Sequence, residues 1–137
     1  MVDHVTREHR SRIMGRVRGR DTSPEMHVRR ATHGMGFRYS LYRRDLPGTP
    51  DLVFPSRKKV ILVHGCFWHQ HNCPKGTRPA SNKEFWNIKL SRNIQRDREN
   101  ISALNNQGWL VLVIWECETK NLKQLKCRIR NFLISVE

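Results

Sequence analysis

Trp109-Leu-Val-Leu-Val-Ile-Trp115 is apolar at every position, and so is the shorter run Val60-Ile-Leu-Val63 earlier in the chain. Strands without polar positions are typical of a sheet that is covered on both faces. Helical patterns precede the first run, separate the two runs and follow the second. This order of helix, three strands, long helix, strand and helix predicts an α/β layer in which α-helices flank a central mixed β-sheet.

Helix-start and turn signals place the other elements around these two runs. Ser23 is the expected N-cap of the first helix, because Pro24 suits the first helical position and Glu25 favours the positive end of the helix dipole. This helix should end at Gly34 or Gly36. Strands are expected at residues 37–42, 51–54, 59–63 and 109–115, and helices at about 82–108 and 121–134.

The charge of the chain indicates a polyanionic partner. Among its 137 residues, 26 Lys and Arg stand against 12 Asp and Glu, which gives a formal net charge of +14. Such an excess raises the self-repulsion of the folded state, so nucleic acid is the expected partner, although charge alone also fits a merely soluble basic protein. No apolar run approaches the roughly 20 residues of a spanning helix, and no signal-peptide core is present. We therefore expect a cytoplasmic protein without a membrane partner.

The length fits one domain with a basic N-terminal arm. Residues 6–20 contain six arginines, and their only large apolar side chains are Ile13, Met14 and Val17. We expect residues 1–20 to form a DNA-binding arm that becomes ordered on a phosphate backbone, and residues 21–137 to form a single domain. A solvated charged terminus is the alternative interpretation of the arm.

The loop His64-Gly-Cys-Phe-Trp-His-Gln-His-Asn-Cys73 combines metal ligands with aromatic side chains. Cys66, His71 and Cys73 are three zinc-type ligands on one loop, and Cys117 follows the second apolar strand. Three thiolates and one imidazole can give the closed tetrahedral geometry of structural zinc. Without a secretory signal, a disulfide framework is less favoured. The fourth cysteine, Cys127, falls in the C-terminal helical pattern, where we expect a buried thiol.

Acidic residues in so basic a chain are candidates for a second metal site. Asp51 opens a strand beside the strand that leads into His64, and Mg²⁺ prefers carboxylate and carbonyl oxygens. A turn or strand-start role after Pro50 is the alternative for Asp51. Asp97 interrupts the apolar stripe of the long helix, so a metal, a histidine or a structural salt bridge must compensate its burial. A loop histidine near such a site could accept a proton from an attacking water.

Taken together, these motifs resemble those of the very short patch repair (Vsr-type) DNA mismatch endonucleases. The matching residues are Glu25, Pro50-Asp51, His64 to His69, His71, Cys73, Phe85-Trp86, Arg96-Asp97-Arg98 and Trp115-Glu-Cys117. The resemblance runs from about Arg7 to Cys117. It implies a restriction-endonuclease-like core and a Mg²⁺-dependent nick in one strand of duplex DNA, 5′ to the thymine of a T·G mismatch left by deamination of 5-methylcytosine. It also implies a bacterial enzyme, monomeric on DNA, with mismatch-repair proteins as expected partners.

The resemblance implies three sets of site residues. In the catalytic set, Asp51 is the central metal-binding carboxylate, His69 is the general base, and Glu25, His64 and Asp97 complete the hydrogen-bond network, with the backbone carbonyl of Val63 as a further Mg²⁺ ligand. The structural zinc set is Cys66, His71, Cys73 and Cys117. The DNA-intercalating set is Phe67, Trp68 and Trp86, with Met14 entering from the opposite groove.

The physical chemistry of an aromatic wedge agrees with that set. Unstacking a base step costs on the order of a few kcal/mol, and a mismatch reduces this cost. Ordinary core packing is the alternative for Phe67 and Trp68, and Trp86 also fits the apolar stripe of its helix. The sequence departs from the family where Val63 replaces a hydroxyl residue and where Gln70 and Asn72 replace possible histidines. It also has no Asp/Glu-x-Lys signature after the third expected strand, where histidines stand instead.

Two other functions are compatible with the sequence. One is a sequence- or structure-specific nuclease of the same fold without mismatch preference. The other is a zinc-stabilised DNA-binding module without catalysis, which explains the charge and the cysteines but gives no role to Asp51 or Asp97.

Overall fold

The computed structural model describes residues 22–135, so the expected arm at residues 1–20, with Met14, lies outside the described residues. The helices are α2 (Ser23–Gly34), α3 (Lys83–Asn106) and α4 (Leu122–Ile134), and the strands are β1 (Leu52–Phe54), β2 (Lys59–His64) and β3 (Leu110–Trp115). Three short 3-10 helices, η1 (Pro55–Arg57), η2 (Pro74–Gly76) and η3 (Glu116–Lys120), lie between them. No helix among the described residues is long and apolar enough to cross a membrane.

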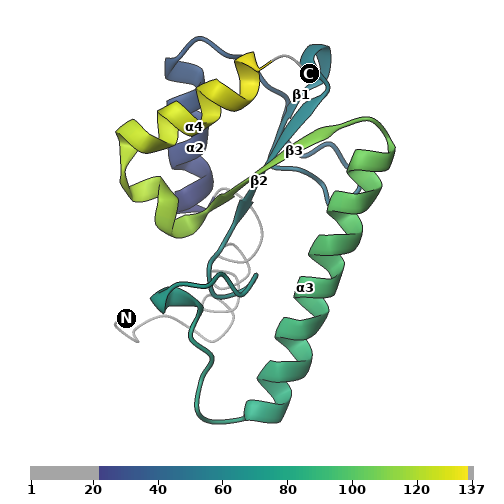
Figure 1. Cartoon of the computed structure of the whole chain (residues 1–137), viewed down its shortest axis with the longest axis vertical. Coiled ribbons are helices and arrows are strands. Elements are labelled where there is room, and N and C mark those ends of the chain that lie inside the picture. Colours follow the sequence, from purple (N-terminus) through teal and green to yellow (C-terminus); the bar gives the residue numbers. More distant parts are fainter. Residues whose placement is uncertain (1–21, 136–137) are drawn as a thin grey trace, which may run out of the picture.

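The three strands form one mixed sheet in the order β1-β2-β3. β1 pairs antiparallel with β2, and β2 pairs parallel with β3, with His64 opposite Trp115 at the end of the ladder. The connection between the parallel strands runs through α3 (Figure 1). Since parallel strands end at the same edge, the loop after His64 and the segment after Trp115 leave the sheet side by side. The predicted α/β class and mixed sheet are confirmed.

Helices cover both faces of this sheet, as its apolar strands require. Figure 1 shows α2 and α4 next to each other on one face and α3 on the other. Successive side chains of a strand point to opposite faces, so Ile61 packs with Val28 and Ile129 while Val60 packs with Leu104 of α3. Full burial of each such side chain contributes about 1.5–3 kcal/mol. These two layers hold the ends of β2 and β3 in fixed register.

The expected strand at residues 37–42 is wrong. Only Ser40 makes a bridge, an isolated antiparallel pair with Val53. Tyr42 has a φ of +53°, in the left-handed region that an extended strand excludes, so the pairing cannot continue. Phe37 and Tyr39 still pack against the core formed with α2 and α4, which explains their alternating apolar pattern.

Several expectations about burial and capping are also corrected. β3 is an edge strand, and within it only Ile114 is fully buried, so it is not covered on both faces along its length. The N-cap of α2 is Thr22, whose hydroxyl accepts a hydrogen bond from the backbone N–H of Glu25, and Ser23 is the first helical residue. Cys127 is exposed, because it lies on the outer face of α4.

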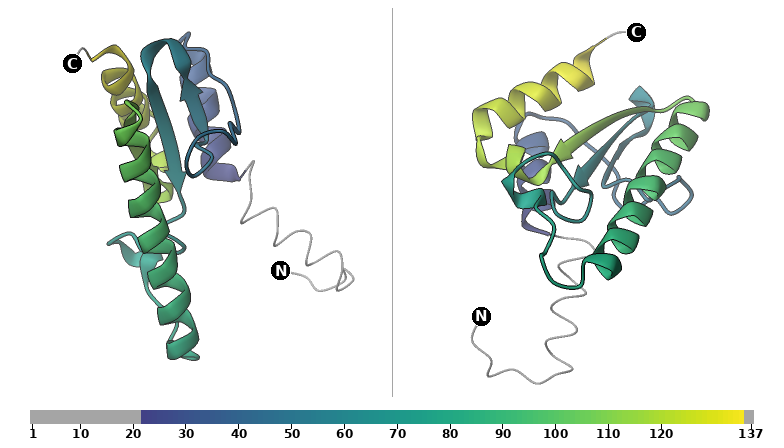
Figure 2. Two further views of the ribbon diagram at one scale, coloured as in Figure 1. Left: turned by 90° about the vertical axis from the view of Figure 1, so that its right-hand side faces the viewer. Right: turned by 60° about the horizontal axis from the view of Figure 1, so that its bottom comes forward.

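The first half of α3 extends beyond the sheet (Figures 1 and 2). Of its 24 residues, only Leu90 and Leu104 are buried, and Phe85 and Ile88 are 57% and 50% exposed. The predicted apolar stripe therefore faces the sheet only in its C-terminal half. The N-terminal half is available to the loop that follows β2.

Candidate metal and nucleic-acid site

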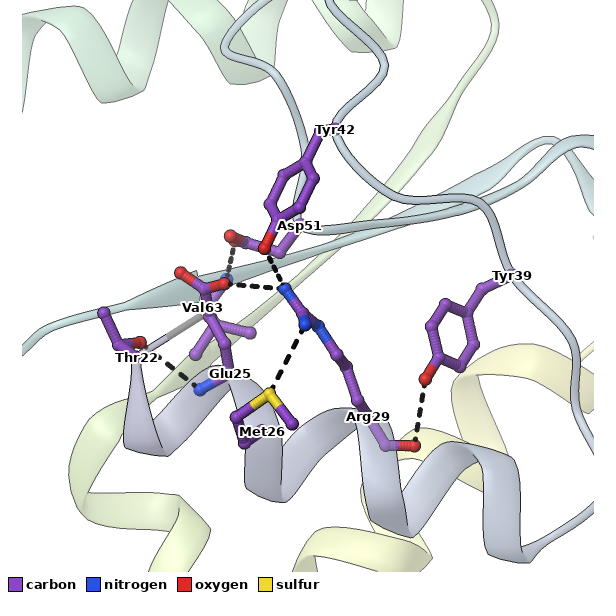
Figure 3. Close-up of polar contacts among 8 residues, drawn as sticks. All are labelled: Thr22, Glu25, Met26, Arg29, Tyr39, Tyr42, Asp51 and Val63. Atoms are coloured by element: carbon purple, nitrogen blue, oxygen red, sulfur yellow. Dashed lines mark hydrogen bonds and ion pairs between the residues drawn. The ribbon is translucent and has the colours of Figure 1, made fainter. Parts of the chain in front are cut away.

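Two carboxyl groups meet where α2, β1 and β2 come together. Asp51, immediately before β1, accepts a hydrogen bond from the backbone N–H of Val63 through Oδ2 at 2.6 Å. Glu25, in the first turn of α2, is buried, and Figure 3 shows its carboxyl group beside that of Asp51. The pKa of Asp51 is raised to about 7, mainly by burial; the hydrogen bond from the Val63 N–H opposes this shift, and the charge of Glu25 adds to it. A divalent cation would stabilise the ionised form of both carboxyl groups.

Arg29 partly balances these two carboxyl groups. Its Nη2 donates to Glu25 Oε2 at 3.2 Å and also to the hydroxyl of Tyr42. The ion pair joins residues one helical turn apart on α2 and is largely buried. The positive charge of Arg29 lowers the pKa of Asp51, against the larger effect of burial. Among the described residues, Arg29 therefore offsets only part of the negative charge that Glu25 and Asp51 carry when both are ionised.

A histidine pair and a carboxylate form a second cluster at the end of β2. His69 Nδ1 lies 2.6 Å from Asp97 Oδ2 of α3. The ring of His69 stacks on that of His64, with centroids 3.9 Å apart and planes within 6°. Burial, helped by the neighbouring His69, lowers the pKa of His64 to about 4, so this ring is neutral near pH 7. The partner that compensates Asp97 on its helix is thus His69.

His64 also carries a buried ring nitrogen without a hydrogen bond among the described residues, Nδ1. Ligand atoms of His64, His69 and Asp97 all lie within 4.8 Å of one another. Two imidazoles and a carboxylate at this separation can bind a cation or a water. The cluster can therefore hold and move a proton at one edge of the sheet.

The four predicted zinc ligands come together on the other side of the same loop. The ligand atoms of Cys66, His71, Cys73 and Cys117 lie within 4.8 Å of one another. His71 Nδ1 is 3.7 Å from Cys66 Sγ and 3.5 Å from Cys117 Sγ. A tetrahedral zinc ion with bonds of about 2.0 and 2.3 Å requires donors about 3.5–3.8 Å apart, so these residues fit the ion.

The thiol pKa values agree with a role in metal binding. Burial raises the pKa of Cys66 to about 12. For Cys73 burial acts in the same direction, but hydrogen bonds from His71 and Cys66 outweigh it and lower the pKa to about 7. Several thiolates so close together are stabilised only by a cation, and the thiolate is the form that binds metal.

Close contacts fix the shape of the loop between β2 and α3, which carries Cys66, His71 and Cys73 and is called the zinc loop below. A Cβ at Gly76 would lie 2.1 Å from the carbonyl oxygen of His71, so no larger residue fits there without a shift of the backbone. The ring of His71 stacks on Trp115 at the end of β3, at 4.3 Å and 16°. Glu116 Oε1 accepts a hydrogen bond from the backbone N–H of Cys66 at 3.3 Å, which ties the loop to β3.

Three aromatic rings of the loop and α3 pack against one another. Phe67 makes edge contacts with Trp68 at 5.0 Å and with Trp86 at 5.3 Å. All three are half-buried, and they lie outside the two core clusters of the described residues. Phe85 extends the group and is exposed. This arrangement disfavours ordinary core packing and leaves aromatic surface at the molecular exterior.

A polar clamp holds this aromatic group. Gln70, with a φ of +54°, donates to the carbonyl oxygens of Phe67 at 2.7 Å and Gly76 at 3.1 Å. Arg78 then joins Gln70 Oε1 to Asn87 Oδ1 of α3, with both distances 2.6 Å. The glutamine that departs from the family pattern thus connects the loop to the helix.

The structure brings together the four predicted zinc ligands and the three predicted aromatic residues of the loop and α3. It places the predicted catalytic residues in two groups, Glu25 with Asp51 and His64 with His69 and Asp97, and adds several residues to which sequence reasoning gave no role. Met14 lies outside the described residues, and Trp86 joins the aromatic group rather than the sheet-facing half of α3. The residues without a predicted role are Arg29, Tyr42, Gln70, Arg78, Asn87 and Glu116. The i,i+4 spacing of Glu25 and Arg29 was a usable signal for the ion pair. The contacts of the other residues depend on the path of the loops, which cannot be predicted from the spacing of residues in the sequence.

Comparison with known proteins finds relatives along nearly the whole chain. The family model described as DNA mismatch endonuclease Vsr matches residues 2–75. Type II nicking enzyme V.XorIIP of Xanthomonas oryzae pv. oryzae is 47% identical over 97% of this chain and 98% of its own length. Type II nicking enzyme V.NmeAIP of Neisseria meningitidis is 41% identical over 88% and 86%. DNA mismatch endonuclease Vsr of Escherichia coli K12 is 38% identical over 91% and 80%.

Proposed function

Because the chain belongs to the Vsr family of DNA mismatch endonucleases, we propose that it nicks one strand of duplex DNA 5′ to the thymine of a T·G mismatch. DNA endonuclease activity follows from the family itself, and duplex DNA as substrate agrees with the net charge of +14. The mismatch, the magnesium ion and the roles of individual residues are our inference from the site. The observation that carries it is that one loop brings His69 onto Asp97 and Phe67 onto Trp86.

The carboxylate pair is the proposed magnesium site. Asp51 and the backbone carbonyl of Val63 would hold Mg²⁺, with Glu25 beside them. The ion would neutralise the phosphate and stabilise the charge that develops on it. Two adjacent carboxyl groups repel each other when both are ionised, and the raised pKa of Asp51 reflects this environment. A bound divalent cation would remove the repulsion.

His69 is the proposed general base. The contact of Nδ1 with Asp97 favours the tautomer in which Nδ1–H donates to the carboxylate and the Nε2 lone pair remains for a proton. The attacking water loses a proton to Nε2 as its oxygen bonds to phosphorus; the bond between phosphorus and the leaving sugar oxygen breaks, and that oxygen takes a proton from solvent. His64 stacks on the ring of His69 and limits its rotation. Its low pKa keeps it neutral, so it adds no charge that would raise the cost of protonating His69.

The aromatic group is the proposed mismatch sensor. Phe67, Trp68 and Trp86 would insert beside the mismatch, where unstacking is less costly than in paired DNA. The zinc set would hold the loop rigid through this insertion, since the loop between β2 and α3 contains only one short 3-10 helix of its own. Met14 and the basic arm would bind the opposite groove and the phosphate backbone.

Active-site variants test the proposal. Asp51→Ala and His69→Ala should each abolish Mg²⁺-dependent nicking of a T·G duplex while its binding, measured by anisotropy, stays within about threefold of wild type. His33→Ala is the matched control, because His33 is an exposed histidine in the last turn of α2. Unchanged nicking by both active-site variants would refute the site.

The names of several relatives, which describe nicking enzymes without reference to a mismatch, give weight to a second function: a nuclease of the same fold that nicks at a specific sequence or structure. Equal rates on matched and mismatched duplexes would favour it. A DNA-binding module without catalysis would show no nicking by the wild-type protein over hours.

A further inference from the structure

Arg29 lies behind the carboxyl groups of the candidate site and contacts three side chains of the described residues through its guanidinium. Besides Glu25 and the Tyr42 hydroxyl, it contacts Met26, whose Sδ lies 3.3 Å from Nη1 (Figure 3). The side chains of Arg29 and Glu25 are only 10% and 5% exposed. Water screens this ion pair little, so the attraction between the two groups is strong. The orientation of the guanidinium therefore also determines the position of the Glu25 carboxylate.

Two tyrosines of the same segment contact this arginine at different groups. Tyr42 contacts the guanidinium through its hydroxyl, and its ring centroid lies 5.3 Å from Arg29 Cζ. Tyr39 donates instead to the main-chain carbonyl oxygen of Arg29 at 3.4 Å, and its ring packs on Phe54 of the core. Figure 3 shows the two hydroxyls on opposite ends of the same residue.

The backbone of Tyr42 is strained in a way that serves this contact. Its φ of +53° is rare for a bulky residue, and such conformations persist only where the surroundings impose them. The strained residue follows the single bridge between Ser40 and Val53. The chain therefore leaves the sheet edge and brings the Tyr42 hydroxyl to Arg29.

We propose that Tyr42 is a positioning residue for the nicking reaction, and that it acts through Arg29 on Glu25. The inference rests on the proposed function, because Glu25 matters only if the carboxyl groups bind the catalytic metal. Without the hydroxyl of Tyr42, Arg29 keeps its charge, its helix position and its contacts with Glu25 and Met26, but it loses one of the groups that orient its guanidinium. The Glu25 carboxylate then loses its fixed place beside Asp51, and displacements of about 1 Å are enough to slow a reaction strongly.

Two matched substitutions separate positioning from a general loss of structure. Tyr42→Phe and Tyr39→Phe each remove a hydroxyl that contacts Arg29, but only the hydroxyl of Tyr42 contacts the guanidinium. In single-turnover nicking of a T·G duplex at saturating DNA and Mg²⁺, Tyr42→Phe should be about tenfold slower than wild type. Tyr39→Phe should stay within twofold, and both variants should keep the wild-type Kd for DNA.

A second measurement reports on Arg29 without any reaction. In ¹⁵N spectra of the protein alone, the Arg29 Nη2–H signal should be protected from exchange in wild type and Tyr39→Phe, and its protection should fall at least fivefold in Tyr42→Phe, because Nη2 is the donor to the Tyr42 hydroxyl. If wild type nicks no duplex, the proposed function fails, while this signal still shows whether Tyr42 fixes Arg29. A wild-type nicking rate in Tyr42→Phe, equal slowing in both variants, or an unchanged Arg29 signal in Tyr42→Phe would overturn the proposal.

Discussion

His69 differs from the other loop histidines in its partner. His71 faces two thiols and His64 is buried and neutral, whereas His69 contacts the carboxylate of Asp97. A carboxylate at Nδ1 orients the ring and stabilises the imidazolium that forms when Nε2 takes a proton. Among three histidines that compete in the sequence, the contact with Asp97 therefore favours His69 as the base.

Asp97→Asn tests this contact with almost no change of size. The amide cannot stabilise an imidazolium and can bind the wrong tautomer, so nicking should slow by on the order of 10²- to 10⁴-fold, with DNA binding unchanged. Single-turnover rates measure the effect. Glu99→Gln is the control, because Glu99 is an exposed carboxylate of the same helix that bonds to Gln95. A rate for Asp97→Asn within threefold of wild type would exclude the role of the pair.

The raised pKa of Asp51 predicts how stability depends on pH. The carboxyl group has a folded-state pKa of about 7 against an ordinary value of 3.8, so it favours the fold fully below pH 4 and loses this contribution as pH rises through 7. Added Mg²⁺ should therefore raise the Tm more at pH 8 than at pH 5, by about a few degrees. Thermal melts of wild type and Asp51→Asn measure this. An equal Mg²⁺ effect at both pH values in wild type would contradict the assignment.

The sequence indicated which residues could be catalytic, but it could not predict which of them contact one another. Asp51, Glu25 and Asp97 were visible as acidic residues in a basic chain, and the loop histidines as possible bases. Which imidazole reaches Asp97 depends on the path of the loop between His64 and His69. Tyr42 gave no signal at all, because its contact with Arg29 follows from a left-handed backbone conformation in a segment that alternates like a strand.

Mismatch recognition and strand cleavage, as proposed above, both depend on the zinc loop. Gly76→Ala would force a Cβ against the carbonyl oxygen of His71, and we expect the variant to lose zinc and with it most of its stability. Metal analysis of purified protein should give about one zinc per chain for wild type and much less for the variant. Gly34→Ala is the control, since a Cβ there meets nothing within 4 Å. Full zinc content in Gly76→Ala would show that the loop geometry is wrong.

The aromatic group should affect discrimination more than affinity. Phe67→Ala removes the ring that contacts both Trp68 and Trp86, so the ratio of T·G to T·A nicking rates should fall about tenfold while the Kd for matched DNA changes less than threefold. Phe37→Ala is the control, because Phe37 is also half-buried but packs on the core. If Phe67→Ala instead lowered the affinity for all duplexes and left the ratio of T·G to T·A nicking rates unchanged, the aromatic group would contact DNA without sensing the mismatch.

At the element scale, strong apolar patterns were reliable and mixed patterns were not. β2, β3 and the three helices lie close to their predicted positions, because long periodic segments have few alternatives. The segment at residues 37–42 alternates like a strand, but its apolar side chains are satisfied by the core beside α2 and α4. The sequence also overstated the burial of β3, since an apolar run does not reveal that a strand lies at the edge of the sheet.

Charge acts at the scale of the whole molecule. The described residues carry the site, and residues 1–20 contribute a further group of arginines. Removal of residues 1–20 should weaken binding to matched and mismatched duplexes by similar factors. It should also make the slope of log K against log salt less steep, by about 0.9 for each phosphate that the arm would otherwise neutralise. Titrations between 50 and 200 mM salt, values that span the usual range for such effects, measure the slope. An unchanged slope would mean that the arm does not bind phosphates.

Viewed as one molecule, the parallel pairing of β2 and β3 joins the three sites. It brings Cys117 to the zinc loop, the loop brings His69 to Asp97, and α3 carries both Asp97 and Trp86. A mismatch that engages the aromatic rings would therefore act on the same loop and helix that hold the proposed base. Recognition and cleavage would thus be coupled through the loop between β2 and α3.

Single-turnover nicking of two duplexes that differ only in one base pair tests whether the mismatch controls cleavage. With Mg²⁺ and saturating protein, the wild-type chain should nick the T·G duplex at the phosphate 5′ to the thymine at least a hundredfold faster than the matched T·A duplex, a difference of about 2.7 kcal/mol in the barrier. Equal rates on the two duplexes would contradict such control.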